Sequence, residues 1–312
     1  MTNSTTVTEF LLTRFSDMWC YRVLHAILFL LIYLATLMGN FLIVTVTTLN
    51  HSLQTPMYFF LRNLSVLDMC YISVTVPKAC AIFLLDNRAI SMAGCAAQVF
   101  LVLLCACMEL LLLTIMALDR YVAICQPLHY YVIINPWFCV QMTLVTLFSG
   151  IFFAGFHTGN TFRLPFCQSN VVHQFFCDVP SLLKLSCSEI LSNEISILIY
   201  VVVVAGGCIA FIAMSYTRIF STVLKFPSRQ ERRKAFSTCV PHILVVTVFI
   251  SSGTAVYMKP TSNSLTVQDM IVSVFYSMVP PFLNSIIYSL RNKQIKEAVR
   301  RIMSRKLSSG KQ

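Results

Sequence analysis

Charged residues are scarce in this chain of 312 residues, of which only 11% are Asp, Glu, Lys or Arg. A soluble domain normally carries about 25% charged residues. Hydrophobic residues make up 57% of the chain, and its mean hydropathy is +0.76. The shortage of charge therefore excludes an ordinary soluble domain and indicates a membrane protein.

The sequence also lacks the motifs of enzymes and of nucleic-acid-binding modules. No nucleophile–base pair, glycine-rich phosphate loop or cysteine pair with zinc spacing is visible. The net charge of +11 comes from short basic stretches between and after apolar runs, which is how membrane proteins set their orientation. Such stretches are too short to form a nucleic-acid-binding module. We expect no enzymatic activity, no nucleic-acid partner and no organic cofactor.

Cysteine, in contrast, is abundant, with 13 residues. Most lie inside apolar runs, where a thiol behaves as a small buried hydrophobe. Cys95 at the start of a run and Cys167, Cys177 and Cys187 in one loop are different. An extracellular loop would use them in disulfides, and the residues alone leave all pairings open. His173 and Cys177 have the spacing of a metal-ligand pair, which a disulfide at Cys177 would exclude.

Seven apolar runs are long enough to span a membrane, which takes about 20 residues in a helix. The first run is too long for the apolar core of a signal peptide, so we expect it to stay as a span. We predict an all-α membrane protein with a seven-transmembrane domain over residues 23–290. The runs are Val23–Leu49, Met57–Leu85, Ala93–Tyr121, Phe138–Phe162, Ile195–Leu224, Phe236–Met258 and Gln268–Leu290.

Basic residues gather after the fifth and seventh runs, and this excess marks the cytoplasmic side. We therefore predict a multi-pass plasma-membrane protein with residues 1–22 extracellular and residues 291–312 cytoplasmic. Asn3 begins an Asn-Ser-Thr glycosylation sequon on the outer side. The basic residues are Arg218, Lys225, Arg229, Arg232, Arg233 and Lys234, and then Arg291, Lys293, Lys296, Arg300, Arg301, Arg305, Lys306 and Lys311.

The C-terminal segment predicts a short amphipathic helix after the last span. Ile295, Val299, Ile302 and Met303 recur at helical spacing, with basic residues on the other face. Such a helix lies on an anionic lipid leaflet. A solvated charged tail is the alternative.

The triplet Asp119-Arg120-Tyr121 ends the third apolar run. A carboxylate beside a guanidinium forms a charge-assisted pair, and breaking the pair frees the arginine for a partner. The triplet therefore predicts a switch at the membrane face. A static ion pair that anchors the helix end is the alternative.

Ionisable residues deep in a span cost roughly 2.5–3.5 kcal/mol on insertion scales and are functional candidates. Asp68 and Glu109 are both deep, and Asn40 and Asn284 add further oxygens. Two carboxylates at mid-bundle repel each other unless a proton or a cation lies between them. Two interpretations therefore remain open. Asp68 and Glu109 hold a Na⁺ ion, or they form a protonated, hydrogen-bonded pair.

Prolines predict breaks in two of the spans. Pro280-Pro281 removes two hydrogen bonds of the last span, just before Asn284 and Tyr288. We expect a broken helix there that can adopt two packings, with a static kink as the alternative. Pro241, next to His242 in the sixth span, is a second such point.

Several further motifs occur in order at matching positions of the seven runs. Together with the triplet they resemble class II (tetrapod-type) olfactory receptors of the rhodopsin-like G-protein-coupled receptor family, over roughly residues 9–300. The matching segments are Gly39-Asn40, Leu53–Leu61 (LQTPMYFFL), Pro77-Lys78, Met116–Cys125 (MALDRYVAIC), Ser215-Tyr216, Lys234–Cys239 (KAFSTC) with His242, and Pro281–Lys293 (PFLNSIIYSLRNK).

The resemblance implies roles for individual residues. Asp119, Arg120 and Tyr121 would hold the resting state and then release Arg120 towards a G protein. Tyr216, His242, Asn284 and Tyr288 would form the rest of the switch. The implied disulfides are Cys95–Cys177 and Cys167–Cys187, and Asp68 and Glu109 match the acidic pair of the family, which favours the ion.

The sequence departs from the family pattern at three positions. Ser285 stands where the last span usually has Pro, and Leu147 where the fourth span commonly has Trp. Ile250 replaces the aromatic residue at the base of the sixth-span pocket, which puts the activation trigger in doubt.

A ligand pocket is expected on the extracellular halves of the third, fifth, sixth and seventh spans. Its third-span face is apolar and carries no carboxylate for an amine. Helix packing is the alternative role for each residue. The predicted lining is Val102, Leu103, Ala106, Cys107, Tyr200, Val204, Ile250, Gly253, Thr254, Tyr257, Ser273 and Ser277.

Apolar walls with few polar groups suit a small, neutral, volatile molecule. The resemblance implies an odorant receptor that activates the stimulatory, olfactory-type G protein and raises cAMP. One alternative is a rhodopsin-like receptor for a lipid or a peptide. Another is a transporter, which would show paired broken helices in two related halves.

Overall fold

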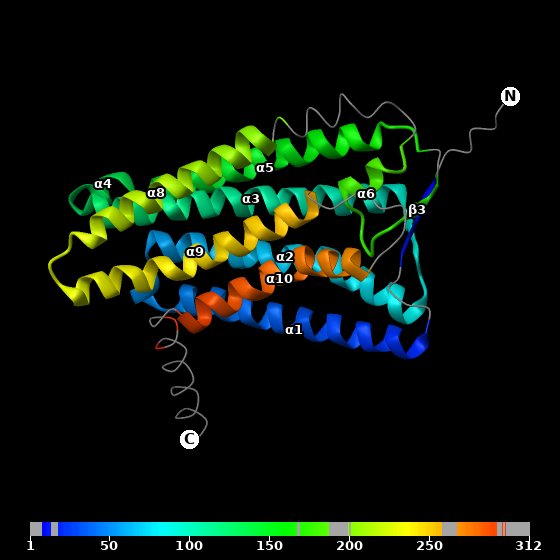
Figure 1. Cartoon of the computed structure of the whole chain (residues 1–312), viewed down its shortest axis with the longest axis horizontal. Helices are drawn as coiled ribbons and strands as arrows, with labels where there is room; N and C mark the ends of the chain where they lie inside the picture. Colours follow the sequence, from blue (N-terminus) through cyan, green and yellow to red (C-terminus); the bar gives the residue numbers. More distant parts are fainter. Residues whose placement is uncertain are drawn as a thin grey trace, which may run out of the picture.

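The structure is a computed structural model that describes residues 8–13, 18–166, 169–186, 199, 201–257, 267–291, 295 and 297. Within this part of the chain, seven helices are long and apolar enough to cross a membrane, which confirms the predicted bundle (Figure 1). They are α1 (Trp19–Leu49), α2 (Pro56–Leu85), α3 (Met92–Cys125), α5 (Pro136–Phe162), α8 (Gly206–Leu224), α9 (Arg229–Tyr257) and α10 (Val267–Arg291).

Short elements connect or precede these helices. A π-helical turn, η3 (Val201–Ala205), leads into α8. The other short elements are η1 (His51–Leu53), η2 (Pro127–His129), α4 (Tyr130–Ile133) and α6 (Val179–Leu183).

Local sequence explains where the helices begin. Pro56 and Pro136 occupy the first turns of α2 and α5, where a missing backbone N–H costs nothing. Asn135 caps α5 by accepting a hydrogen bond from the Phe138 amide. The helix α9 begins at Arg229, earlier than the apolar run from Phe236, because Gln, Glu, Arg and Lys are good helix formers and continue it past the apolar part.

The predicted break at Pro280-Pro281 is wrong, since α10 is continuous and contains both prolines. The helix α9 likewise continues through Pro241. In a membrane bundle, neighbouring helices can satisfy the backbone groups that a proline leaves free. Pro280 and Pro281 lack the N–H groups that would bond to the Tyr276 and Ser277 carbonyls. The Asn40 side chain of α1 donates to the carbonyl of Pro281 itself at 3.4 Å, which links α1 to this part of α10.

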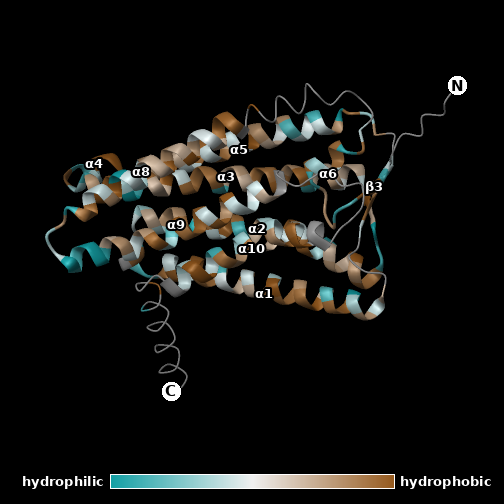
Figure 2. Ribbon diagram, viewed as in Figure 1, coloured by the Kyte–Doolittle hydropathy of each residue, from teal (hydrophilic) through white to brown (hydrophobic). Residues whose placement is uncertain are grey.

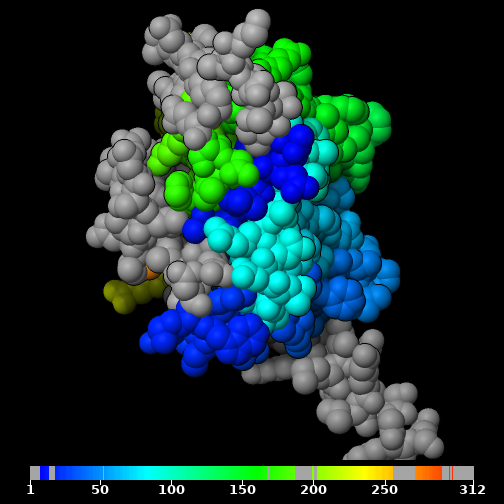
Figure 3. Space-filling view, turned by 90° about the vertical axis from the view of Figure 1, so that its right-hand side faces the viewer, coloured from blue at the N-terminus to red at the C-terminus, as the bar shows by residue number. Residues whose placement is uncertain are grey.

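A small sheet, which the sequence analysis did not anticipate, covers one end of the bundle. Strand β1 (Glu9–Leu12) pairs antiparallel with β2 (Ala89–Ser91) and parallel with β3 (Val171–Val172). Figure 3 looks at this end and shows β1, in blue, between cyan and green segments. Phe10 and Leu12 are fully buried. We call this the sheet end, and the opposite end the α4 end.

Hydropathy follows the pattern of a membrane-spanning bundle. Apolar colours dominate the outer helical surfaces in Figure 2, with hydrophilic segments at the two ends. Met38, Phe41, Phe148 and Phe152 are each at least 65% exposed, which suits contact with lipid. The predicted amphipathic helix after α10, and the residues Asn3, Cys167, Cys187 and Tyr200, lie outside the described residues.

Helices α1 and α10 pack tightly against each other at Gly39. A Cβ atom at this position would lie 2.7 Å from Ser285 Oγ and 2.9 Å from Ser285 Cβ. We expect Gly39→Ala to lower the stability of the protein by about 1–3 kcal/mol, the usual cost of overpacking. Thermal unfolding of the purified protein measures this.

The matched control is Gly207→Ala on α8, where an added Cβ meets no atom within 4 Å. Adding Ser285→Gly to Gly39→Ala should recover most of the loss. A double variant as unstable as Gly39→Ala alone would contradict the steric explanation.

Candidate functional site

Three predicted residues meet at the centre of the bundle. Asp68 on α2, Glu109 on α3 and Asn284 on α10 are 2%, 7% and 2% exposed. The Asn284 Nδ2 atom lies 3.2 Å from both carboxylate oxygens of Asp68 and 3.0 Å from Glu109 Oε1. One amide group therefore joins two acidic residues from different helices.

The same region holds oxygens that could serve a cation. The Oδ1 atoms of Asn40 and Asn284 and the hydroxyl of Tyr288 are buried, with no hydrogen-bond partner among the described residues. Hard cations take oxygen ligands, so the two carboxylates fit Na⁺ chemically, while Asn284 turns its Nδ2 donor and not its Oδ1 atom towards them. Asn40 uses its Nδ2 atom within α1, towards the Thr36 carbonyl, and for α10 at Pro281.

A second cluster lies at the α4 end. The Arg120 guanidinium donates to the Asp119 carboxylate through Nε, at 2.9 Å, and through a terminal nitrogen. The Tyr130 hydroxyl, from α4, donates to the other Asp119 oxygen at 2.8 Å. Burial, together with the Asp119 charge, raises the pKa of Tyr130, so its hydroxyl stays protonated and donates. Asp119 is fully buried and Arg120 is held beside it.

Tyr130 thus joins Asp119 and Arg120 in this cluster, although the sequence did not place it in the predicted switch. We expect Tyr130→Phe to weaken the hold on Asp119 and Arg120 and to raise ligand-independent signalling. One hydrogen bond to a charged group contributes about 1.5 kcal/mol, which corresponds to roughly a tenfold shift between two states. Basal second-messenger levels at matched surface expression measure this.

Tyr131→Phe is the control, because Tyr131 is 85% exposed on the same short helix. Equal basal signalling from both variants would show that the bond to Asp119 carries no restraint.

The predicted residues Tyr216 and His242 are in direct contact. The Tyr216 hydroxyl lies 2.6 Å from His242 Nδ1, and His242 Nε2 lies 3.1 Å from the Leu113 carbonyl. Since a carbonyl only accepts, Nε2 carries the proton and Nδ1 accepts from Tyr216. This chain of bonds joins α8, α9 and α3 in the same half as Arg120. Tyr216 and Tyr288 belong to one hydrophobic cluster of buried residues, and Tyr121 packs against it.

At the sheet end, the Cys95–Cys177 disulfide ties α3 to the loop before α6. This confirms the first implied pair and excludes Cys177 as a metal ligand. The Gln98 side chain accepts from the Cys177 amide at 2.8 Å and donates to the Val74 carbonyl at 2.9 Å. In the same loop, Asp178 accepts from the Tyr276 hydroxyl of α10 at 3.0 Å. The loop is thus attached to α3 and α10, and Gln98 also links α3 to α2.

The predicted pocket residues have different surroundings. Val102, Leu103, Ala106, Val204 and Ile250 are half-buried and Cys107 is buried. Gly253 and Thr254 are exposed on α9, and the Thr254 hydroxyl bonds to the Ile250 carbonyl of its own helix. Ser273 and Ser277 are buried on α10, where the Ser277 hydroxyl donates to the Ser273 carbonyl. Tyr257 lies within α9, and its side chain is not described. The pocket stays a prediction.

Sequence reasoning missed Tyr130, Gln98 and Asp178. Gln98 carried a usable signal, because it is a polar residue inside an apolar span. Tyr130 and Asp178 lie in the segments that connect the spans, where nothing in the pattern marks a partner far along the chain.

Comparison with known proteins agrees with the fold. The crystal structure of squid rhodopsin matches with a TM-score of 0.73 at 17% identity, over 94% of this chain and 88% of that one. The olfactory receptor family model matches residues 29–306. Human olfactory receptor 14C36 is 63% identical over 98% of both chains, and human olfactory receptor 14A16 is 53% identical over 99% of both.

The seven helices and their polar clusters define a multi-pass membrane protein with the rhodopsin-like receptor fold. The chain belongs to the olfactory receptor family. These receptors are not enzymes, so the chain is not one either.

Proposed function

We propose that this receptor binds a small, mostly apolar odorant within the helix bundle and activates a stimulatory, olfactory-type G protein to raise cAMP. The observation that carries the proposal is Arg120, held by Asp119 and Tyr130 at the α4 end. Arg120 is a cation in a restrained state at a membrane face, which is what a partner-operated switch requires. The family supports the same reading.

The proposal places the α4 end in the cytoplasm and the sheet end outside. The basic residues near the α8–α9 connection and in the C-terminal segment support this orientation. With the sheet end outside, Asn3 is a glycosylation site and Cys167–Cys187 is a second extracellular disulfide. The segment after α10 forms the amphipathic helix on the inner leaflet.

The odorant would bind between the sheet-end halves of α3, α8, α9 and α10. Val102, Leu103 and Ala106 supply apolar, half-buried surface on α3. Thr254 supplies a polar group, and Gly253 leaves open space, since an added Cβ meets no atom within 4 Å. A neutral molecule with one or two hydrogen-bonding groups suits this composition.

The deciding experiment measures cAMP in cells that express the receptor with the stimulatory α subunit, across a panel of small volatile compounds. A dose-dependent rise that disappears when the α subunit is deleted supports the proposal and names a ligand class. If the well-expressed wild type gives no cAMP response and Ile250→Tyr gives one, then Ile250, which replaces the usual aromatic residue, has impaired activation. Responses only to lipids or peptides would favour the rival receptor class instead.

We further propose that Na⁺ lies between Asp68 and Glu109. Replacing Na⁺ by choline at constant ionic strength should then lower the thermal midpoint of the wild type. At ten times the dissociation constant, bound ligand stabilises by about 1.4 kcal/mol. Glu109→Gln should remove this dependence on Na⁺. A wild-type midpoint independent of Na⁺ would instead favour a proton shared by the two carboxylates.

A further inference from the structure

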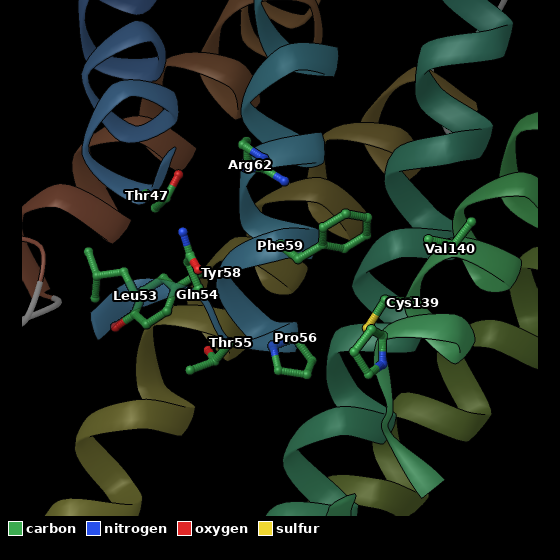
Figure 4. Close-up of a pocket in the computed structure, with 11 residues that line it drawn as sticks. Thr47, Leu53, Gln54, Thr55, Pro56, Tyr58, Phe59, Arg62, Cys139 and Val140 are labelled. Atoms are coloured by element: carbon green, nitrogen blue, oxygen red, sulfur yellow. The ribbon is translucent and has the colours of Figure 1, made fainter. Parts of the chain in front are cut away.

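A pocket of about 370 Å³ opens at the α4 end, away from the proposed odorant site. Its walls come from α1, the turn before α2, α2 itself and α5 (Figure 4). We call it the α2–α5 pocket. Its lining includes Thr47, Thr55, Phe59, Arg62, Cys139 and Val140.

Among the described residues that line the pocket, Arg62 is the only one with a charged side chain. Its guanidinium lies 5.5 Å from the centre of the Phe59 ring and donates a long hydrogen bond of 3.4 Å to the Thr48 hydroxyl. Among the described residues, the ion pairs are those of Arg22 and Arg120, and none involves Arg62. This arginine therefore has its charge and most of its donors available, and guanidinium groups bind phosphate through paired hydrogen bonds.

The remaining lining is amphipathic. Phe59, Cys139 and Val140 supply apolar surface, and Val140 is 43% exposed on the outside of α5. The hydroxyls of Thr47 and Thr55 add polar groups, and Thr55 makes no capping hydrogen bond with its side chain. A ligand that fits has an anionic group for Arg62 and an apolar part for the outer wall.

The depth of the pocket selects a lipid over a soluble anion. Pro56 and Pro136 begin α2 and α5, so the pocket lies where two spans enter the membrane. Arg62 lies about 9 Å along α2 from Pro56, at 1.5 Å per residue. Phospholipid headgroups and the first acyl carbons occupy this zone, and arginine at a helix end reaches towards them.

We propose that the α2–α5 pocket binds an anionic phospholipid of the adjacent leaflet, with its phosphate on Arg62 and an acyl chain along Phe59 and Val140. On the proposed orientation this is the inner leaflet, which carries most phosphatidylserine. Lipid binding here requires neither an odorant nor a G protein, so its failure leaves the proposed signalling function untouched.

The test uses the full-length receptor in nanodiscs of phosphatidylcholine with phosphatidylserine and cholesterol, followed by native mass spectrometry of the lipids that remain bound. We expect the wild type to retain phosphatidylserine. Arg62→Gln should reduce that retention about fivefold, the effect of one basic residue at an anionic surface. Val140→Trp should reduce it as well, because it fills the apolar wall and leaves the charge unchanged.

The matched control is Arg218→Gln, an exposed arginine on α8 outside the pocket, which should retain phosphatidylserine like the wild type. Thermal midpoints of all variants verify that they are folded. Equal losses in Arg62→Gln and Arg218→Gln would overturn the proposal in favour of general surface charge. Retention of cholesterol alone, unaffected by Arg62→Gln, would overturn it in favour of a sterol groove.

Discussion

Arg120→Ala is expected to abolish odorant-dependent cAMP production while leaving surface expression near that of the wild type. The Arg120 side chain hydrogen-bonds to Asp119 within its own helix and is 14% exposed. Its removal therefore takes away the cation that, on the proposed function, meets the G protein, and it cuts no bond between helices. Dose–response curves on cells sorted for equal surface receptor measure the loss.

Asp119→Asn distinguishes a switch from a folding defect. We expect this variant to raise basal cAMP, whereas Arg120→Ala should abolish the cAMP response. The carboxamide keeps the shape of the side chain but loses the charge that holds Arg120, and hydrogen bonds to charged groups contribute about 1.5–3 kcal/mol. Basal cAMP should rise roughly tenfold or more. If both variants lost signalling equally at equal expression, the pair would be the static anchor of the helix end.

The helical architecture was predictable because membrane-length apolar runs leave few alternatives. Each backbone polar group in lipid must be satisfied within its own helix, so seven runs such as Val23–Leu49 become seven helices. The sheet β2-β1-β3 was not predictable, because Glu9–Leu12 is short and pairs with segments far along the chain. The continuity of α10 through Pro280-Pro281 was not predictable either, because a proline removes local hydrogen bonds and the packing of the whole bundle decides whether the helix continues.

The site residues likewise include some that the sequence could identify and others that depend on the packing of the helices. Asp68 and Glu109 were identifiable because a deep carboxylate is costly, and their common contact is Asn284. That Asn40 would turn its amide to Pro281 followed only from the packing of α1 on α10. Tyr130 was missed because its partner, Asp119, already had a neighbour in Arg120, and the intervening turn hides the contact.

Asn284→Leu should cause a large loss of stability. It removes the one amide that donates to both Asp68 and Glu109, and it leaves buried carboxylate oxygens facing an apolar side chain. A cost of about 3 kcal/mol follows from losing hydrogen bonds to charged groups. For a protein of this size or somewhat smaller, that lowers the thermal midpoint by roughly 10 °C.

A double-mutant cycle tests whether the carboxylates cause this loss. In a background of Asp68→Asn with Glu109→Gln, the charges are gone, so Asn284→Leu should cost less than half as much as in the wild type. Ser285→Ala is the neighbouring control, since the Ser285 hydroxyl donates only to the Phe282 carbonyl of its own helix among the bonds described. If Asn284→Leu lowers stability equally in both backgrounds, the loss comes from packing around Asn284. The hydrogen bonds of its amide to the acidic pair would then not contribute to stability.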